Sequence, residues 1–289
     1  MKLPNFDYAC PTSLAEAIDL LARHDGDAKP ISGGQSLMPM LAFRLAAPSL
    51  LVDLRLVPGL DRITVDESGV ELGARVRWRD VEADERLARA CPLLAAAIPH
   101  IAHYQIRNRG TIGGSLAHAD PAAELPAVAL ACAAEIVIEG PDGRRVVAAQ
   151  DFFLGPLTTA LEPAELIVAV RFPPWPAARR HGFQEFSRRR GDFALAGVAL
   201  FFDEESGLIG NAHVAGFGIG DVPQRLAGAE AELNGRAPTL ETFAAAARAA
   251  AAEVAPQTDI HAEADYRRAL LGTLTERTLA QAAGLGHAA

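Results

Sequence analysis

Two glycine pairs constrain the fold of this 289-residue chain more than any other feature, and the first is placed where a strand-like pattern gives way to a helical one. The first lies in ISGGQS at 31–36, between a short apolar stretch at 28–31 and a helical pattern at 36–45. Adjacent glycines let the backbone turn sharply and bring bare N–H groups close to a ligand. The start of the following helix and the hydroxyl and amide side chains add donors that suit a pyrophosphate.

The second pair lies in RGTIGGS at 109–115, within a predicted glycine-rich loop at 106–114. Two such loops are able to close on one elongated anion. Neither loop is followed by Gly-Lys-Ser/Thr and neither reads G-x-G-x-x-G, so the usual dinucleotide fold has no support. A Gly-Gly turn is more often only a turn, and the two pairs by themselves leave the anion site open.

Three polar side chains follow the second pair, namely His118, Asp120 and Glu124. A carboxylate beside a phosphate would repel it, so we expect these carboxylates to accept hydrogen bonds from sugar or polyol hydroxyls. A metal site that also uses the histidines at 100–103 is the competing idea, but the His-Glu-x-x-His arrangement is missing. Ser115, His118 and Asp120 are the residue types of a hydrolase triad. They lie too close together in the sequence, however, and no Gly-x-Ser-x-Gly elbow is present.

Charge and cysteine usage exclude several classes of function. The net charge of −9 argues against nucleic acid or an anionic membrane as partner. No apolar run is long enough to span a membrane, and the first ten residues lack the apolar core of a signal peptide, so we expect a cytoplasmic protein. Cys10, Cys91 and Cys132 lie far apart without a Cys-x-x-Cys pair, which predicts reduced thiols and no iron–sulfur cluster in this chain.

The pattern of apolar residues predicts an α+β chain with a boundary at the proline cluster PPWP, 173–176, which continues neither a helix nor a central strand. Ser13 and Glu16 form a capping box at the start of the first helix. The predicted helices span 13–23, 36–45, 78–90, 92–103, 122–131, 225–233, 239–253 and 262–283. The predicted strands span 28–31, 50–54, 63–65, 70–74, 134–139, 145–148, 165–172, 181–188, 194–202 and 211–219. The arginines at 188–190 are expected to form a solvated turn, with Phe193 as a candidate aromatic lid.

Five segments together resemble the FAD-binding medium subunit of the molybdenum hydroxylases, the family of carbon monoxide dehydrogenase and xanthine dehydrogenase. They are FDYACPTSLAEAIDLL at 6–21, GGQSLMP at 33–39, RNRGTIGGSLAHADPAAELPA at 107–127, FFLGPLTTALEPAELI at 152–167 and RRRGDFALAGVAL at 188–200. The resemblance implies a two-lobed FAD-binding domain of the vanillyl-alcohol-oxidase-like type over 1–174, with lobes at about 1–55 and 56–174. A smaller domain of sheet plus helices would follow over 175–289.

The resemblance also implies which residues bind the cofactor. The two glycine segments would hold the FAD diphosphate, through Ser32, Gly33, Gly34, Gln35 and Ser36 and through Gly110, Thr111, Ile112, Gly113, Gly114 and Ser115. Asp120 and Glu124 would lie near the ribityl or diphosphate end, Ile101 and Ile106 beside the flavin, Leu166 near the adenine, and Asp192 and Phe193 near the isoalloxazine. Glu124 stands where Asp is commoner, and Ser115 stands where Asn is common, which replaces an amide with a single hydroxyl donor.

The function implied is electron transfer through non-covalently bound FAD, with no catalytic residue and no metal in this chain. A large partner subunit would carry the molybdenum cofactor, and a small partner would carry two [2Fe–2S] clusters, in a dimer of heterotrimers. The FAD would pass electrons to a terminal acceptor. Two alternatives stay open: a stand-alone FAD oxidase or dehydrogenase of the same fold, and a scaffold that has lost its flavin. The substrate and the acceptor lie outside this sequence.

Overall fold

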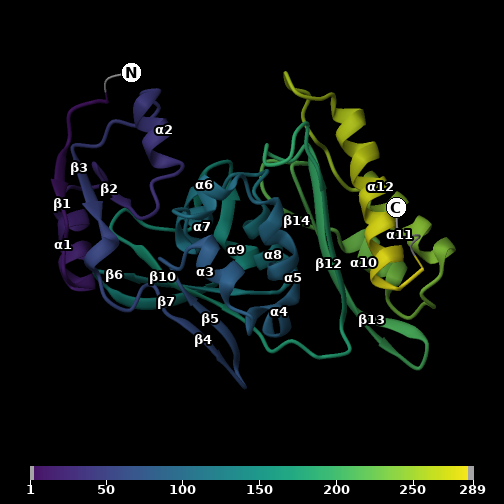
Figure 1. Ribbon diagram of the computed structural model, residues 1–289. Helices are drawn as coiled ribbons and strands as arrows, with labels where there is room; N and C mark the ends of the chain where they lie inside the picture. The colour runs from purple at the N-terminus through teal and green to yellow at the C-terminus, as the bar shows by residue number, and fades with distance from the viewer. Residues whose placement is uncertain (1–2, 286–289) are drawn as a thin grey trace.

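The computed structural model describes residues 3–285, and it arranges them as three units side by side (Figure 1). The first is a small parallel sheet in the order β1 (Asp7–Ala9), β3 (Leu50–Asp53) and β2 (Ala28–Ile31), flanked by α1 (Leu14–Arg23) and α2 (Leu37–Ala42). The predicted start of α1 is confirmed, because the Ser13 hydroxyl accepts a hydrogen bond from the Glu16 N–H at 3.1 Å. The Glu16 carboxylate accepts from the N–H of Thr12, one residue earlier than a capping box requires.

The second unit is built on an antiparallel sheet in the order β4-β5-β10-β6-β7. Its strands are β4 (Ile63–Asp66), β5 (Gly69–Gly73), β6 (Glu135–Gly140), β7 (Gly143–Ala148) and β10 (Leu166–Phe172), with a small hairpin of β8 (Phe153–Gly155) and β9 (Thr158–Thr159) beside them. The segment Pro141-Asp142-Gly143 is typical of a hairpin turn, and it does join β6 to β7, with Gly143 at the start of β7 at φ +104°. Short helices pack on this sheet, and α9 (Ala149–Phe152) leads into β8.

The prediction of two long helices over 78–90 and 92–103 is wrong, because the backbone breaks each range into short helices. The first becomes α3 (Trp78–Ala83) and α4 (Leu87–Ala90), since Asp84 is extended and its carboxylate accepts from the Arg86 N–H at 3.0 Å. The second becomes α5 (Pro92–Ala97) and a single 3₁₀ turn. Ala102 at φ +43° then ends the run before α6 (Tyr104–Arg107) begins.

The third unit is an antiparallel sheet of β11 (Arg180–Phe186), β12 (Ala196–Glu205), β13 (Leu208–Phe217) and β14 (Gln224–Arg225). Its outer face carries α10 (Ala227–Leu233), α11 (Leu240–Ala252) and α12 (Ala264–Ala282), at the right of Figure 1. The proline cluster at 173–176 lies between the last strand of the second sheet and β11. The three helices α10, α11 and α12 lie where the sequence predicted helices over 225–233, 239–253 and 262–283.

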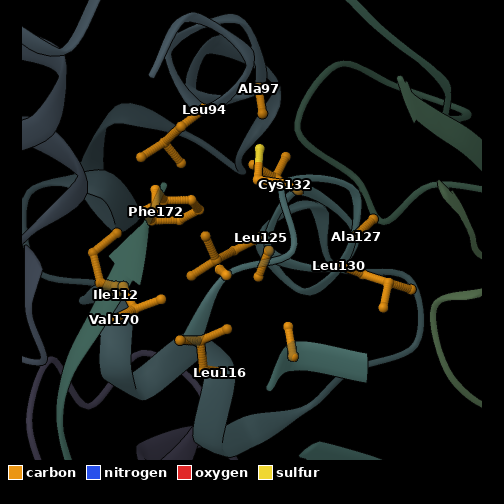
Figure 2. Close-up of a cluster of buried hydrophobic side chains, with 14 of the residues drawn as sticks. Leu94, Ala97, Ile112, Leu116, Leu125, Ala127, Leu130, Cys132, Val170 and Phe172 are labelled. Atoms are coloured by element: carbon orange, nitrogen blue, oxygen red, sulfur yellow. The ribbon is translucent and has the colours of Figure 1, made fainter. Parts of the chain in front are cut away.

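The second and third units share one apolar core. Every residue of α8 (Glu124–Ala131) is buried, and the helix packs against β12 and β13. Figure 2 shows its side chains among those of α5, α7 (Ile112–His118) and β10. His213 of β13 also donates from Nδ1 to the carbonyl oxygen of Ala131 at 2.6 Å. This continuous packing holds the C-terminal sheet in place against the second unit.

Candidate functional site

A cleft of about 910 Å³ opens between the first and second units and reaches the loop at 191–193 of the third. It is lined by Ser32–Ser36, Ile106, Gly110, Thr111, Gly113–Ser115, Asp120, Glu124, Leu166, Asp192 and Phe193. All of these are residues that the resemblance proposed for the cofactor. Ile101 and Ile112 were proposed with them, but both side chains are buried in the core of the second unit instead.

The two glycine segments both line the cleft and are in direct contact with each other. The Thr111 hydroxyl donates to the Ser32 hydroxyl at 3.1 Å. A Cβ on Gly33 would lie 2.2 Å from the carbonyl oxygen of Arg109, which leaves no space for any side chain. Gly33 is therefore needed for the close approach of the two segments, and the two loops do meet as their sequences suggested.

The first glycine segment presents free donors. Within residues 3–285, the backbone N–H groups of Gly33, Gly34 and Gln35 donate no hydrogen bond to the protein. Gly34 lies at φ +73°, a conformation that favours glycine, and the Gln35 amide donates to the Gly33 carbonyl at 3.0 Å. Bare N–H groups held in a fixed loop are the donors that an anionic diphosphate requires.

The second glycine pair differs from the prediction, because it lies inside the first turn of α7 rather than in a loop. The N–H of Ile112 donates to Val76, that of Gly113 donates to Ala74, and that of Gly114 donates to the Thr111 hydroxyl. A Cβ on Gly113 would also lie 2.5 Å from the Ala74 side chain. Gly113 therefore allows α7 to pack on the chain that follows β5.

The carboxyl group of Glu124 lies at the first residue of α8 and is 8% exposed. Burial, followed by the nearby charge of Glu185, raises the pKa of Glu124 to about 8. The group is therefore protonated at neutral pH and can donate a hydrogen bond, whereas its sequence suggested only an acceptor. The Asp120 carboxylate accepts from the Ala122 N–H at 2.8 Å, and burial lowers the pKa of His118.

The loop at 188–193 reaches the cleft, and its residues 191–193 form part of the wall. The arginines at 188–190 are exposed, as predicted for a solvated turn, and Phe193 is 64% exposed where it lines the cleft. Gly191 lies at φ +87°, and a Cβ there would lie 2.4 Å from the His103 ring. The third unit therefore reaches the cleft through a loop that packs tightly on the turn before α6.

Sequence reasoning missed several parts of the cleft wall, chiefly Lys29, Trp78, Leu157, Thr158 and Glu162. Leu157 lies at φ +53° at the tip of the β8–β9 hairpin, and its N–H donates to the carbonyl of Ala119, itself at φ +50°. The hairpin belongs to the segment FFLGPLTTALEP, whose only local signal was the Gly-Pro pair. No strand pattern of useful length marked it.

Neither competing site is assembled in the part of the chain that the structure describes. No group of three or more candidate metal ligands comes together there. Within residues 3–285, no hydrogen bond links the side chains of Ser115, His118 and Asp120 into a triad. The three cysteines are free, with Cys91 and Cys132 buried, and no helix of these residues is long and apolar enough to cross a membrane.

Comparison with known proteins places the chain in a family. Residues 4–175 match the FAD binding domain in molybdopterin dehydrogenase, and residues 181–282 match the CO dehydrogenase flavoprotein C-terminal domain. The chain therefore belongs to the family of FAD-binding medium subunits of molybdenum hydroxylases, and it is a subunit of an oxidoreductase. The predicted α+β fold, with an FAD-binding domain followed by a smaller domain, is confirmed.

Individual relatives match along almost their full length. The chain is 41% identical to the 6-hydroxypseudooxynicotine dehydrogenase complex subunit alpha of Paenarthrobacter nicotinovorans, over 98% of this chain and 96% of that protein. It is 38% identical to the carbon monoxide dehydrogenase medium chain of Hydrogenophaga pseudoflava, over 96% of each. A solved carbon monoxide dehydrogenase from the latter organism, lacking the Mo-pyranopterin moiety of its cofactor, superposes with a TM-score of 0.96 at 39% identity, covering 99% of this chain and 100% of that one.

Proposed function

We propose that this chain carries FAD non-covalently and transfers electrons within a molybdenum hydroxylase. In this proposal it accepts electrons from [2Fe–2S] clusters of a small partner subunit and passes them to a terminal acceptor. A large partner subunit holds the molybdenum cofactor and oxidises the substrate. The observation that carries the proposal is the cleft in which the two glycine segments meet, within a chain that matches both domains of the family.

The residues of the cleft fit the cofactor. Residues 33–35, with their free N–H groups, line the cleft together with Ser36 and Ser115, and the FAD diphosphate would bind to these donors. The cleft also contains carboxyl groups at Asp120 and Glu124, which suit the hydroxyls of the ribityl chain better than a phosphate. When bound, FAD supplies the exchange of electrons between one-electron and two-electron partners.

The chain's own residues bind and orient the cofactor. The contact between Thr111 and Ser32 fixes the two glycine segments against each other before any ligand binds. Phe193 and the hairpin tip at Leu157 add apolar surface on the cleft wall. Domain assignments of 1–174 for FAD binding and 175–289 for the C-terminal domain are part of this proposal.

The names of relatives support the assignment of this chain to a complex of several subunits. Relatives are called the nicotine 6-hydroxylase medium subunit and the carbon monoxide dehydrogenase medium chain, at 42% and 38% identity. We infer that this chain is likewise the medium subunit of a heterotrimeric unit, assembled as a dimer. The substrate pocket then belongs to the large subunit, which leaves the choice among carbon monoxide, an aldehyde and an N-heteroaromatic ring to that subunit.

One observation favours a second candidate, a stand-alone FAD oxidase or dehydrogenase. Such an enzyme needs an acid or base in the cleft, and Glu124 is a buried acid there whose pKa is raised to about 8. The two candidates are separated by purifying the FAD-loaded chain and testing carbon monoxide, aldehydes and N-heteroaromatic rings with a dye acceptor. The subunit proposal predicts no turnover by the chain alone and co-purification of molybdenum and iron with its native complex. Turnover at the rate of a whole hydroxylase, without molybdenum, would favour the stand-alone enzyme.

A further inference from the structure

The guanidinium group of Arg267, on α12, connects the outer helical layer to the bases of two segments that line the cleft. Arg267 is only 7% exposed. Its Nη1 atom donates to the carbonyl oxygen of Leu195 at 2.7 Å and to that of Gly218 at 3.0 Å. Its Nη2 atom donates to the Asp259 carboxylate at 2.8 Å. One buried side chain therefore joins the residue before β12, the residue after β13 and the turn before α12.

The first acceptor of Arg267 lies at the base of the loop that carries Phe193. The N–H of Leu195 donates to the carbonyl oxygen of Phe186 at 2.8 Å, which closes the β11–β12 hairpin below the loop at 187–194. Leu195 is therefore held through its N–H by β11 and through its carbonyl oxygen by Arg267. Phe193, which lines the cleft, is only two residues away from this doubly held position.

The second acceptor, Gly218, leads to the segment at 120–124, whose first and last residues line the cleft. The N–H of Gly218 donates to the carbonyl oxygen of Pro121 at 2.9 Å, inside that segment. Gly218 lies at φ +70°, and a Cβ there would lie 2.9 Å from the carbonyl oxygen of Ala194, so it packs directly on the chain that follows the loop. Arg267 therefore reaches both cleft segments through neighbouring backbone groups.

The position of Arg267 within α12 does not stabilise the helix itself. Arg267 is the fourth residue of α12, and the helix dipole disfavours a cation in the first turn. Its Nε atom is buried without a hydrogen-bond partner within residues 3–285, and a buried guanidinium also loses the hydration of its charge. The contacts with the two carbonyl oxygens and with Asp259 offset these costs, and two of the three contacts lead to the cleft.

We propose that Arg267 is a positioning residue for the cofactor, which holds the loop at 191–193 and the segment at 120–124 in place to bind the flavin end of FAD. This inference rests on the proposed function, which assigns these two segments to the isoalloxazine and the ribityl chain. Arg267 does not line the cleft, so it acts on the cofactor only through them. Groups that are held in place before the ligand arrives need not be ordered on binding, and the ligand therefore binds more tightly.

The test measures the binding of FAD and of ADP, which lacks the flavin, to the full chain after its flavin has been removed. The variants are Arg267→Gln and Arg267→Lys. Arg179→Gln is the matched control, because the Arg179 side chain is 11% exposed, donates two hydrogen bonds to Asp203 in the same unit and does not line the cleft. We expect Arg267→Gln to bind FAD about tenfold more weakly than the control, and to bind ADP equally well. Arg267→Lys should lie between them, because a lysine keeps the charge but donates from a single atom.

A second readout follows the flavin itself at saturating FAD. We expect the visible circular dichroism of the bound flavin to weaken in Arg267→Gln, because the loop at 191–193 no longer holds the isoalloxazine in one orientation. The same signal should be unchanged in Arg179→Gln. The melting temperature of the FAD-free chain should fall in both variants, so a loss of stability alone does not produce the expected pattern.

The possible failures are distinguishable. A wild-type chain that binds no FAD would refute the proposed function itself. A wild-type chain that binds FAD, with an Arg267→Gln variant that matches Arg179→Gln in FAD affinity and circular dichroism, would overturn only the positioning role. Equal losses of FAD and ADP binding in Arg267→Gln would also overturn it, since the whole cleft would then be affected. If Arg267→Gln fails to fold, Asp259→Asn decides, because the Asp259 side chain is 47% exposed and contacts the guanidinium from the surface. A weaker loss of FAD binding alone is then expected, and no loss would overturn the inference.

Discussion

Replacing Gly33 with alanine tests the contact between the two glycine segments. The added Cβ would lie 2.2 Å from the carbonyl oxygen of Arg109 and 2.9 Å from Cα of Gly110. Both neighbours are backbone atoms, so no change of rotamer relieves the clash, and the two segments must move apart. Charge-assisted hydrogen bonds are worth about 1.5–3 kcal/mol each, so the loss of two bonds to the diphosphate would weaken FAD binding by roughly two to four decades.

The assay is titration of the apo chain with FAD, followed by quenching of the flavin fluorescence, with the melting temperature measured in parallel. Gly59→Ala is the matched control, because Gly59 lies at φ +83° with no atom within 4 Å of its Cβ and does not line the cleft. The control should bind FAD as the wild type does, despite its strained backbone. A folded Gly33→Ala chain that binds FAD within threefold of the wild type would refute the reasoning, as would an equal loss in Gly59→Ala.

Three further predictions concern the cofactor linkage and the stability of the fold. Acid precipitation should release FAD into the supernatant, and flavin retained on the pellet would contradict non-covalent binding. Asp203→Asn should lower the free energy of unfolding by about 1 kcal/mol at pH 7, since Arg179 donates two hydrogen bonds to this carboxylate and thereby lowers its pKa. Because that pKa is depressed in the folded state, the stabilisation is present above the unfolded pKa and is lost as pH falls through the folded pKa. The difference between variant and wild type in urea unfolding should therefore shrink on acidification, and a constant difference would count against this pair. Ser13→Ala should cost about 1 kcal/mol in the same assay, because the helix loses its N-cap, and an unchanged unfolding midpoint would show that this cap adds nothing.

The features that local chemistry decides were predictable from the sequence. Ser13 marks the start of α1, and Gly143 marks the turn between β6 and β7, because each acts on neighbouring residues. The resemblance to a family, rather than any single motif, pointed to the family of the chain and to residues that line the cleft. The glycine pairs by themselves indicated only that an anion was a candidate ligand.

The features that long-range contacts decide were not predictable from the residues. The apolar pattern continues past Asp84 and Ala102, so it also does not report the local turns that end the helices there. The N–H of Gly113 donates a hydrogen bond to the carbonyl oxygen of Ala74, a residue far earlier in the chain. Burial, followed by the charge of Glu185 on β11, raises the pKa of Glu124, and no spacing in the sequence reports either cause.

The measurement that tests the central claim most directly compares the native complex with the same complex after its FAD has been removed. The substrate, identified by screening carbon monoxide, aldehydes and N-heteroaromatic rings, is added to each, and the absorbance of the iron–sulfur clusters is followed together with the reduction of the terminal acceptor. If this chain transfers electrons through FAD, the clusters of the FAD-free complex will still be reduced by substrate, acceptor reduction will stop, and added FAD will restore it. Acceptor reduction that continues at the full rate without FAD would contradict the account.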